Sequence, residues 1–216
     1  MKRILLILVF IFSLGGMFAD LTTDNELYYS FDDENLSGSN PIDLSINGND
    51  GTNNGATTGV TGIVNESFDF DGTNDYIIQN SANVQDTTFS ISIWFLNSFS
   101  GSSRTIAARS SDSSNRQYQL YQRGADNRIV MSFFNGSSTT VGSLVSDTTY
   151  NDGNWHHIVI TQNENNAQMF IDGIGSLLFL PVFLIVTCIN STWSSDTGTK
   201  LVISDQIPNS LFSLVI

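Results

Sequence analysis

Positive charge is scarce in this sequence. Of its 216 residues, 8 are Lys or Arg and 21 are Asp or Glu, which gives a formal net charge of −13 at pH 7. A chain this acidic is repelled by the phosphate backbone of nucleic acids and by anionic membrane surfaces. We therefore expect no nucleic-acid partner, and the acidity suits a protein that is soluble outside the cell.

Cysteine is nearly absent too. The one Cys, Cys188, cannot form an intramolecular disulfide, so an exported fold has to rely on core burial or on a metal. We interpret Cys188 as a small apolar residue inside an apolar run. Charged residues make up 13% of the chain, and its polarity comes from Asn, Ser, Thr and Gly, which favour turns over helices. This composition predicts short strands joined by polar turns.

The N-terminus has the pattern of a signal peptide. Two basic residues are followed by an apolar run over residues 4–14 and by small residues up to Ala19, and the polar mature chain starts at Asp20. We interpret residues 1–19 as a cleaved signal peptide and predict a secreted or cell-surface protein. The alternative is a membrane anchor, but the apolar run is shorter than the roughly 20 residues that a spanning helix needs.

Short runs of alternating apolar residues continue to about residue 171. In one of them, Phe89, Ile91, Ile93 and Phe95 alternate with serines and Trp94, the period-2 pattern of a strand with one buried face. Turn residues separate these runs at regular spacing, and no segment has a capped helical period. The pattern predicts an all-β sandwich or barrel.

Six motifs in a fixed order are similar to a known family. They are LYYSFD (residues 27–32), DLSINGNDGT (43–52), FDFDGTNDY (68–76), FSISIW (89–94), WHHIV (155–159) and FIDG (170–173). Over residues 26–173 this succession resembles the laminin-G-like jelly-roll domain of the concanavalin A-like lectin/glucanase superfamily. The resemblance implies an antiparallel jelly-roll β-sandwich, an extracellular location and ligand binding rather than catalysis.

Beyond Gly173 the sequence departs from this family. The resemblance implies a strand with an Ile-Gly pair and a closing strand close to GxIDEVRI, and we find neither. The chain instead has an apolar run over residues 174–189 and a polar tail to residue 216. We predict an incomplete domain at 20–173 and an aberrant tail at 174–216 that arose by a frameshift or a sequencing slip shortly after Gly173. The alternative is a membrane anchor, although the run is short, contains Pro181 and has no basic flank.

Residues for catalysis are few. His156 and His157 are the two histidines of the chain, and as strand neighbours they point to opposite faces and cannot chelate one metal. Retaining glycosidases need two carboxyl groups about 5–5.5 Å apart, and Asp32 with Glu34 is the one nominal pair, at a strand end. We predict a protein that is not an enzyme; the alternative is a glycoside hydrolase of the same fold.

Calcium is the one cofactor that the sequence indicates. An Asp-x-Ser-x-Asn run has the oxygen spacing of a calcium loop, although its closing position holds Asn54 instead of Glu. The alternative is a solvated turn. The resemblance also implies calcium binding, which is common in this superfamily. A second candidate cation position is therefore the Asp-Gly turn near Asp71 and Asp75. The candidate metal ligands are Asp43, Asn47, Asp50, Asp71 and Asp75.

Aromatic side chains are the candidate ligand contacts. Sugars pack on aromatic faces beside amide and carboxylate groups, and the residues that could form such a surface are Trp94, Tyr118, Tyr121 and Tyr150. The alternative for each is a place in the core. We predict a binding or adhesion module for carbohydrate or a cell-surface protein. The alternative is that the chain is a non-functional N-terminal fragment of a larger surface protein.

Overall fold

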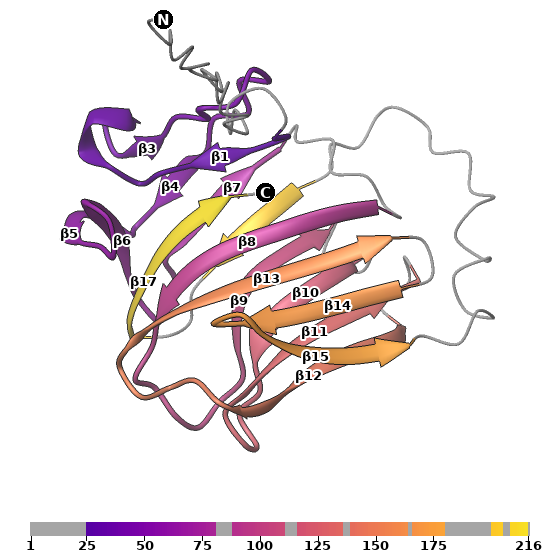
Figure 1. Ribbon diagram of the computed structural model, residues 1–216. Helices are drawn as coiled ribbons and strands as arrows, with labels where there is room; N and C mark the ends of the chain where they lie inside the picture. Colours follow the sequence, from indigo (N-terminus) through magenta and orange to yellow (C-terminus); the bar gives the residue numbers. More distant parts are fainter. Residues whose placement is uncertain are drawn as a thin grey trace, which may run out of the picture.

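The computed structural model describes residues 25–80, 88–110, 116–135, 139–163, 166–179, 200–204 and 208–215. Two antiparallel sheets lie face to face and form a β-sandwich (Figure 1). The longest helix within these ranges is a three-residue 3-10 turn, η1 (Asp33–Asn35). The all-β, antiparallel jelly-roll architecture that the sequence predicts is therefore confirmed.

The front sheet of Figure 1 has eight strands. In spatial order they are β15 (Ile174–Phe179), β14 (Asn166–Ile171), β13 (Trp155–Asn163), β8 (Thr88–Leu96), β17 (Pro208–Val215), β6 (Glu66–Asp71) and β5 (Thr57–Thr61), with β1 (Tyr28–Tyr29) paired to β17. The pairing of β8 with β13 is continuous from Thr88 to Leu96. This long ladder places Trp94 of β8 directly beside His157 of β13.

The back sheet has seven strands. In spatial order they are β12 (Thr140–Thr149), β11 (Arg128–Phe134), β10 (Arg116–Gln122), β9 (Arg104–Ser110), β16 (Lys200–Ser204), β7 (Tyr76–Gln79) and β4 (Thr52–Asn54). A small hairpin of β2 (Leu36–Ser37) and β3 (Asn40–Pro41) lies outside both sheets.

Alternation along the strands separates the core from the surface. On β8, Ile91, Ile93 and Phe95 are buried, whereas Ser92 and Trp94 between them are partly exposed. The one-sided burial expected for this segment is confirmed. A slip of one residue in its pairing would turn every apolar side chain toward water, so the pattern fixes the register.

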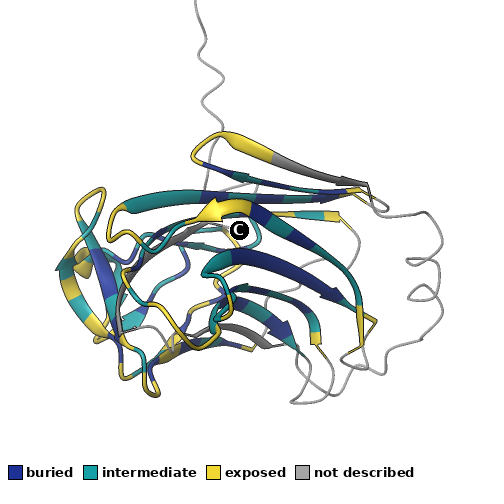
Figure 2. Cartoon of the chain, turned by 90° about the horizontal axis from the view of Figure 1, so that it is seen from below, coloured by how far each residue is buried: buried dark blue, intermediate teal, exposed yellow. Residues whose placement is uncertain are grey.

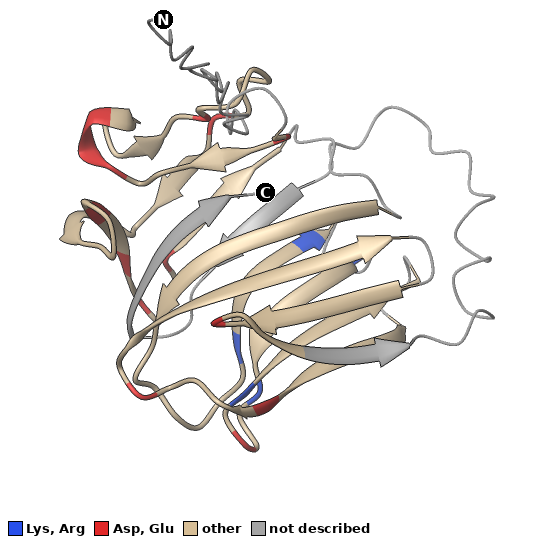
Figure 3. Ribbon diagram, in the orientation of Figure 1, with Lys and Arg blue, Asp and Glu red and all other residues tan. Residues whose placement is uncertain are grey.

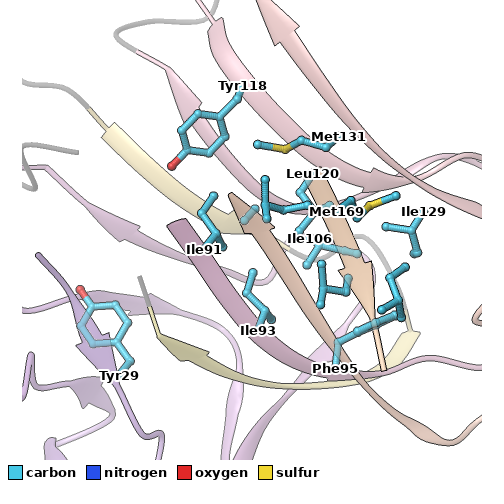
Figure 4. Packing of buried hydrophobic residues seen from close by; sticks show 14 of the residues in the cluster. Tyr29, Ile91, Ile93, Phe95, Ile106, Tyr118, Leu120, Ile129, Met131 and Met169 are labelled. Carbon is cyan, nitrogen blue, oxygen red and sulfur yellow. The ribbon is translucent and has the colours of Figure 1, made fainter. Parts of the chain in front are cut away.

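The core lies between the two sheets. Figure 4 shows Ile91, Ile93 and Phe95 of the front sheet directed toward Leu120 and Met131 of the back sheet, all five 1% exposed or less. In Figure 2 the buried stretches run along both sheets, while exposed residues concentrate at turns. Each such side chain contributes about 1.5–3 kcal/mol relative to an exposed one, so burial is a large stabilising term in the described part of the chain.

Three strands come from the segment that follows Gly173. β15 begins with Ile174 and Gly175 and pairs with β14 along its whole length, which corrects the expectation that an Ile-Gly strand is missing. β16 lies between β7 and β9, and β17 between β6 and β8. Ladder hydrogen bonds join backbone groups, so this pairing needs no particular side-chain motif. A frameshift origin of the segment stays a prediction for the nucleotide sequence.

Some predictions fall outside the described residues. The signal peptide at 1–19 lies there, as do Cys188 and residues 180–189 of the apolar run. Within the described ranges, no helix has the length and apolar character needed to cross a membrane.

Candidate functional site

A stacked pair of rings stands on the outer face of the front sheet. Trp94 on β8 has His157 on β13 as its direct cross-strand partner. The indole and imidazole rings stack with their centroids 4.6 Å apart and their planes 17° from parallel. His157 Nε2 also lies 2.8 Å from Ser92 Oγ, which fixes the orientation of the imidazole. Ring pairs of this kind contribute about 0.5–1.5 kcal/mol beyond their buried area, so this pair is held firmly in place.

Other partly exposed side chains extend this surface along β13 and β14. The strand register places Trp155 beside Leu96, and Val159 between Ser92 and Phe170. We call the surface the Trp94 face, and define it as Ser92, Trp94, Leu96, Trp155, His157, Val159 and Phe170. It combines aromatic and aliphatic area with a hydroxyl group and an imidazole, which is the chemistry that contacts the apolar face and the hydroxyl groups of a sugar.

The second histidine points the opposite way. His156 shares the inward side of β13 with the buried Ile158, and its imidazole is 12% exposed, beside the ring of Phe95. Its Nδ1 lies 2.8 Å from Asp172 Oδ2 and its Nε2 lies 3.0 Å from Asp152 Oδ1. One histidine therefore lies on the inward side of β13 and the other is hydrogen-bonded at the sheet surface, as expected for neighbouring residues on a strand.

The two histidines have opposite electrostatic surroundings. Burial lowers the pKa of His156, but the hydrogen bonds to Asp172 and Asp152 outweigh it and raise the pKa above 6.5. Hydrogen bonds from Asn154 and His156 in turn hold the pKa of the Asp152 carboxyl well below 3.8. Burial lowers the pKa of His157, against the attraction of Asp172. His156 is therefore protonated more readily than His157.

One carboxylate contacts both histidines. Asp172 Oδ2 faces the ring of His156, and Asp172 Oδ1 accepts the backbone N–H of His157 at 2.9 Å. The backbone N–H of Asp172 donates to the carbonyl of His157 at 3.0 Å. Asp172 has a left-handed φ of 52° and Gly173 a φ of 78°, a pair that Asp and Gly tolerate. The Asp-Gly turn thus aims this carboxylate at β13.

Tyr118 does not fit its predicted role. Its side chain lies in the core, 2% exposed, and stacks on Phe89 with ring centroids 5.0 Å apart. Figure 4 shows it pointing into the space between the sheets. The alternative reading of this residue, core packing, describes its position, since a ring this buried cannot contact a surface ligand.

The remaining two candidate tyrosines lie away from Trp94. Tyr121 is partly exposed on the outer face of the back sheet, between Thr105 and Val130 of the neighbouring strands. This is the sheet on which the described arginines gather (Figure 3). Tyr150 packs against the core and meets His156 edge to face, with centroids 4.9 Å apart. The structure therefore does not bring the four candidate aromatic residues into one site.

Asp43 organises the first candidate calcium loop through hydrogen bonds. Its Oδ1 accepts the backbone N–H groups of Tyr28 and Ser45 at 2.8 and 2.9 Å. Its Oδ2 accepts the Ser45 hydroxyl at 2.7 Å and the Asn49 backbone N–H at 2.8 Å. Asp50 Oδ1 accepts the backbone N–H of Asp43 at 2.9 Å. These contacts give both carboxylates a structural role in shaping the loop.

The other candidate ligands also take part in turn hydrogen bonds. Asn47 Nδ2 donates to backbone carbonyls 3.1 and 3.3 Å away. Asp71 Oδ1 accepts the Thr73 backbone N–H at 2.7 Å, and Asp75 Oδ2 accepts that of Asp71 at 2.8 Å. Over the described ranges, no group of three or more His, Cys, Asp or Glu side chains is arranged to hold a metal. Calcium stays a prediction.

An acidic pocket of about 620 Å³ lies at the N-terminal end of β6. It is lined by Asp32, Asp33, Glu34, Gly59, Thr61, Asn65 and Glu66. Glu66 Oε2 accepts the Asp33 backbone N–H at 2.6 Å, and Asp32 Oδ1 accepts the Glu66 backbone N–H at 3.1 Å. The nominal glycosidase pair, Asp32 and Glu34, lies here, far in sequence from the Trp94 face.

Sequence reasoning missed three members of this arrangement. It named neither His157 nor Asp152 nor Asp172 as a site residue, because it placed the two histidines on opposite faces without assigning either of them to one face. The available signal was the register: pairing the WHHIV and FIDG motifs as a hairpin places Asp172 next to the two histidines, as observed for Ile158 with Ile171. The stacking of Trp94 on His157 needed the β8–β13 register, which joins segments more than 60 residues apart.

Comparison with known proteins agrees with this architecture. Residues 71–175 match the profile of the concanavalin A-like lectin/glucanases superfamily. No curated protein sequence gives a match.

Several solved structures have the same fold, and three of them are parts of larger proteins. Domain 4 of an extracellular GH43 arabinanase from Geobacillus stearothermophilus, solved with arabinotriose, has a TM-score of 0.65 at 16% identity, over 88% of this chain and 90% of that one. The binding domain of Paraclostridial Mosquitocidal Protein 1 has a TM-score of 0.63 at 15% identity, over 90% and 48%. The receptor-binding domain of botulinum neurotoxin mosaic serotype C/D has a TM-score of 0.60 at 16% identity, over 88% and 46%. The chain thus spans about half the length of the two toxin domains.

Proposed function

The chain carries a laminin-G-like domain of the concanavalin A-like lectin/glucanases superfamily, and from this we propose that it is a non-catalytic binding module that recognises carbohydrate or a cell-surface protein through the Trp94 face. The stacked Trp94–His157 pair carries the proposal. Its rings are already ordered and only partly exposed, so a ligand that packs on them gains contact without ordering a mobile side chain.

The chemistry of the surrounding residues supports carbohydrate as the first ligand class. The apolar side of a sugar ring packs on aromatic area, and its hydroxyl groups need nearby donors and acceptors. Trp155 and Phe170 add aromatic area, and Ser92 adds a hydroxyl group. The arabinanase domain solved with arabinotriose supports the same ligand class, although at 16% identity the likeness itself extends to the fold alone.

A glycan array tests this proposal directly. The full chain is expected to bind a restricted set of glycans, and Trp94→Ala is expected to lose those signals while keeping the wild-type circular dichroism spectrum. Absence of specific binding to any glycan, together with binding to a receptor protein in a cell-surface pull-down, would move the proposal to its protein-binding form. Absence of both would contradict it.

We also propose export of the protein, on the basis of residues 1–19. Mass spectrometry of the protein recovered from the culture medium or the cell surface is expected to find Asp20 at the N-terminus. Recovery of an intact N-terminus in the cell interior would contradict this.

Calcium is proposed as a ligand of the acidic turns. Titration calorimetry of the EDTA-treated chain is expected to give a heat of calcium binding and an upward shift in unfolding temperature, since a ligand that binds only the folded state stabilises it. Neither effect would be seen if the turns are held by their hydrogen bonds alone.

Glycoside hydrolysis is the second candidate function, and the acidic pocket is the observation that favours it. A pocket with four carboxyl groups could supply an acid and a base to a glycosidic bond. Release of reducing sugar by the wild-type chain and its loss in Asp32→Asn and Glu34→Gln would support hydrolysis. Equal rates with and without the chain would reject it.

A further inference from the structure

The imidazole of His156 lies between two carboxylates. Its two ring nitrogens are 2.8 Å from Asp172 Oδ2 and 3.0 Å from Asp152 Oδ1. A carboxylate accepts hydrogen bonds and does not donate them, and a neutral imidazole has one N–H. Both contacts can therefore be hydrogen bonds only when both ring nitrogens carry a proton, and the geometry describes an imidazolium.

We propose that protonated His156, held between Asp152 and Asp172, positions the Trp94 face, so that ligand binding at this face weakens as the pH rises. The inference rests on the proposed function for its ligand-binding part. It assigns to His156, Asp152 and Asp172 a positioning role beneath the binding surface.

Asp172 connects the charged ring to the Trp94 face. Its Oδ2 faces His156, and its Oδ1 holds the backbone N–H of His157, whose ring stacks on Trp94. A shift of the Asp172 carboxylate therefore affects both His156 and His157. The left-handed φ of Asp172 is a conformation that a non-glycine residue keeps when its surroundings hold it.

The groups around His156 favour its charged form. Asp152 comes from the loop before β13 and Asp172 from the turn after β14. Tyr150, the residue after β12, presents its ring, and Asp147 on β12 is close enough to influence that tyrosine. The β8 neighbour, Phe95, carries no charge. Strands β15 and β17 contain no titratable side chain in their sequences. The net field at the ring is thus negative.

Loss of the proton breaks one side of the arrangement. A neutral ring keeps one N–H, so the nitrogen that has lost its proton turns a lone pair toward a carboxylate oxygen. The side chain of Asp152 is 55% exposed and that of Asp172 40%, so water can solvate whichever carboxylate is released. The loop and the turn are then no longer tied through the ring, and the support under His157 loosens.

Nuclear magnetic resonance of the full chain measures the charge state directly. The chain has two histidines, so two imidazole titrations are expected, one with a pKa above 6.5 for His156 and one below for His157. Asp152→Asn and Asp172→Asn should lower the higher pKa. Asp126→Asn is the matched control, since that carboxylate pairs with Arg123 in the turn between β10 and β11 of the other sheet, and it should leave both histidine titrations unchanged.

The ligand-binding part has its own readout. Affinity for the tightest glycan from the array is expected to fall about five-fold, a typical coupling, as the pH rises through the His156 pKa. His156→Gln, which keeps an N–H donor but no charge, should give a flat profile. The Trp94 indole N–H resonance should follow the same titration in the absence of ligand.

The outcomes separate the two proposals. If no glycan binds, the proposed function fails, and the charged arrangement is still judged by the histidine titration and the Trp94 resonance. A pKa for His156 at or below 6.5, or a Trp94 resonance that ignores its titration, overturns the inference. An identical pH profile for wild type and His156→Gln overturns it as well. If His156→Gln does not fold, Asp152→Asn takes its place in the pH profile. The Asp152 side chain is largely solvent-exposed, so this substitution should leave folding intact.

Discussion

The imidazole of His157 lies flat against the indole of Trp94, with the two ring centroids 4.6 Å apart. This contact joins β8 to β13 on the outside of the sandwich, where no core packing holds either ring. His157→Ala is expected to lower the free energy of unfolding by about 1 kcal/mol, the scale of one aromatic pair. His157→Phe keeps a stacking ring and should recover most of that loss. Urea unfolding of both variants measures it, and equal losses would mean that stacking is not the stabilising part of the contact.

Truncation of Tyr118 should affect stability and leave binding alone. Its ring is 2% exposed and packs against Phe89, so Tyr118→Ala opens a cavity and is expected to cost about 3–5 kcal/mol. Residual folded protein should still bind the wild-type ligand with unchanged affinity. A selective loss of affinity at wild-type stability would return Tyr118 to the list of ligand contacts.

Comparison of these two aromatic residues shows what the sequence can and cannot predict. Strand alternation correctly separated the buried Ile93 from the outward Trp94, because period-2 burial is a local property. Around Tyr118 the strand alternates Tyr118 and Leu120 with Gln117 and Gln119, so the same local pattern could have placed Tyr118 on the inward side. The stacking of Trp94 on His157 depends on a register between distant segments, and this is not encoded in either segment separately.

Stability should depend on pH through His156. Burial lowers its pKa, and the hydrogen bonds to Asp172 and Asp152 raise it to a value above 6.5. A group with a raised folded-state pKa contributes its full stabilisation below the unfolded-state pKa of about 6.5, and this is lost as the pH rises through the folded-state pKa. The exposed carboxylates limit the effect to about 0.2–1 kcal/mol.

Urea unfolding at several pH values checks this dependence. The wild-type chain is expected to lose stability from about pH 6 upward across the window set by the two pKa values, and His156→Gln to lose this part of the slope. High salt should weaken the difference, because exposed charges are screened. The account would be contradicted if, over this pH window, the free energy of unfolding of the wild type rose relative to that of His156→Gln.

Asp43 should stabilise the protein with or without calcium. Its two oxygens accept four hydrogen bonds from Tyr28, Ser45 and Asn49. Removal of them in Asp43→Ala is expected to cost about 3 kcal/mol, since hydrogen bonds to charged groups are worth about 1.5–3 kcal/mol each and solvation recovers part of them. Chemical unfolding in EDTA and in calcium measures the cost. A loss seen only in calcium would assign Asp43 to a metal site instead of a hydrogen-bonded turn.

The affinity of the full chain for its tightest glycan, compared between Trp94→Ala and Tyr121→Ala, tests the central claim most directly. The two residues are partly exposed aromatic side chains on opposite outer faces of the sandwich. The account predicts a loss of about 2 kcal/mol, roughly 30-fold in Kd, for Trp94→Ala, and a Kd within about two-fold of wild type for Tyr121→Ala, a change of less than 0.5 kcal/mol. The reverse ranking, or equal losses, would contradict it.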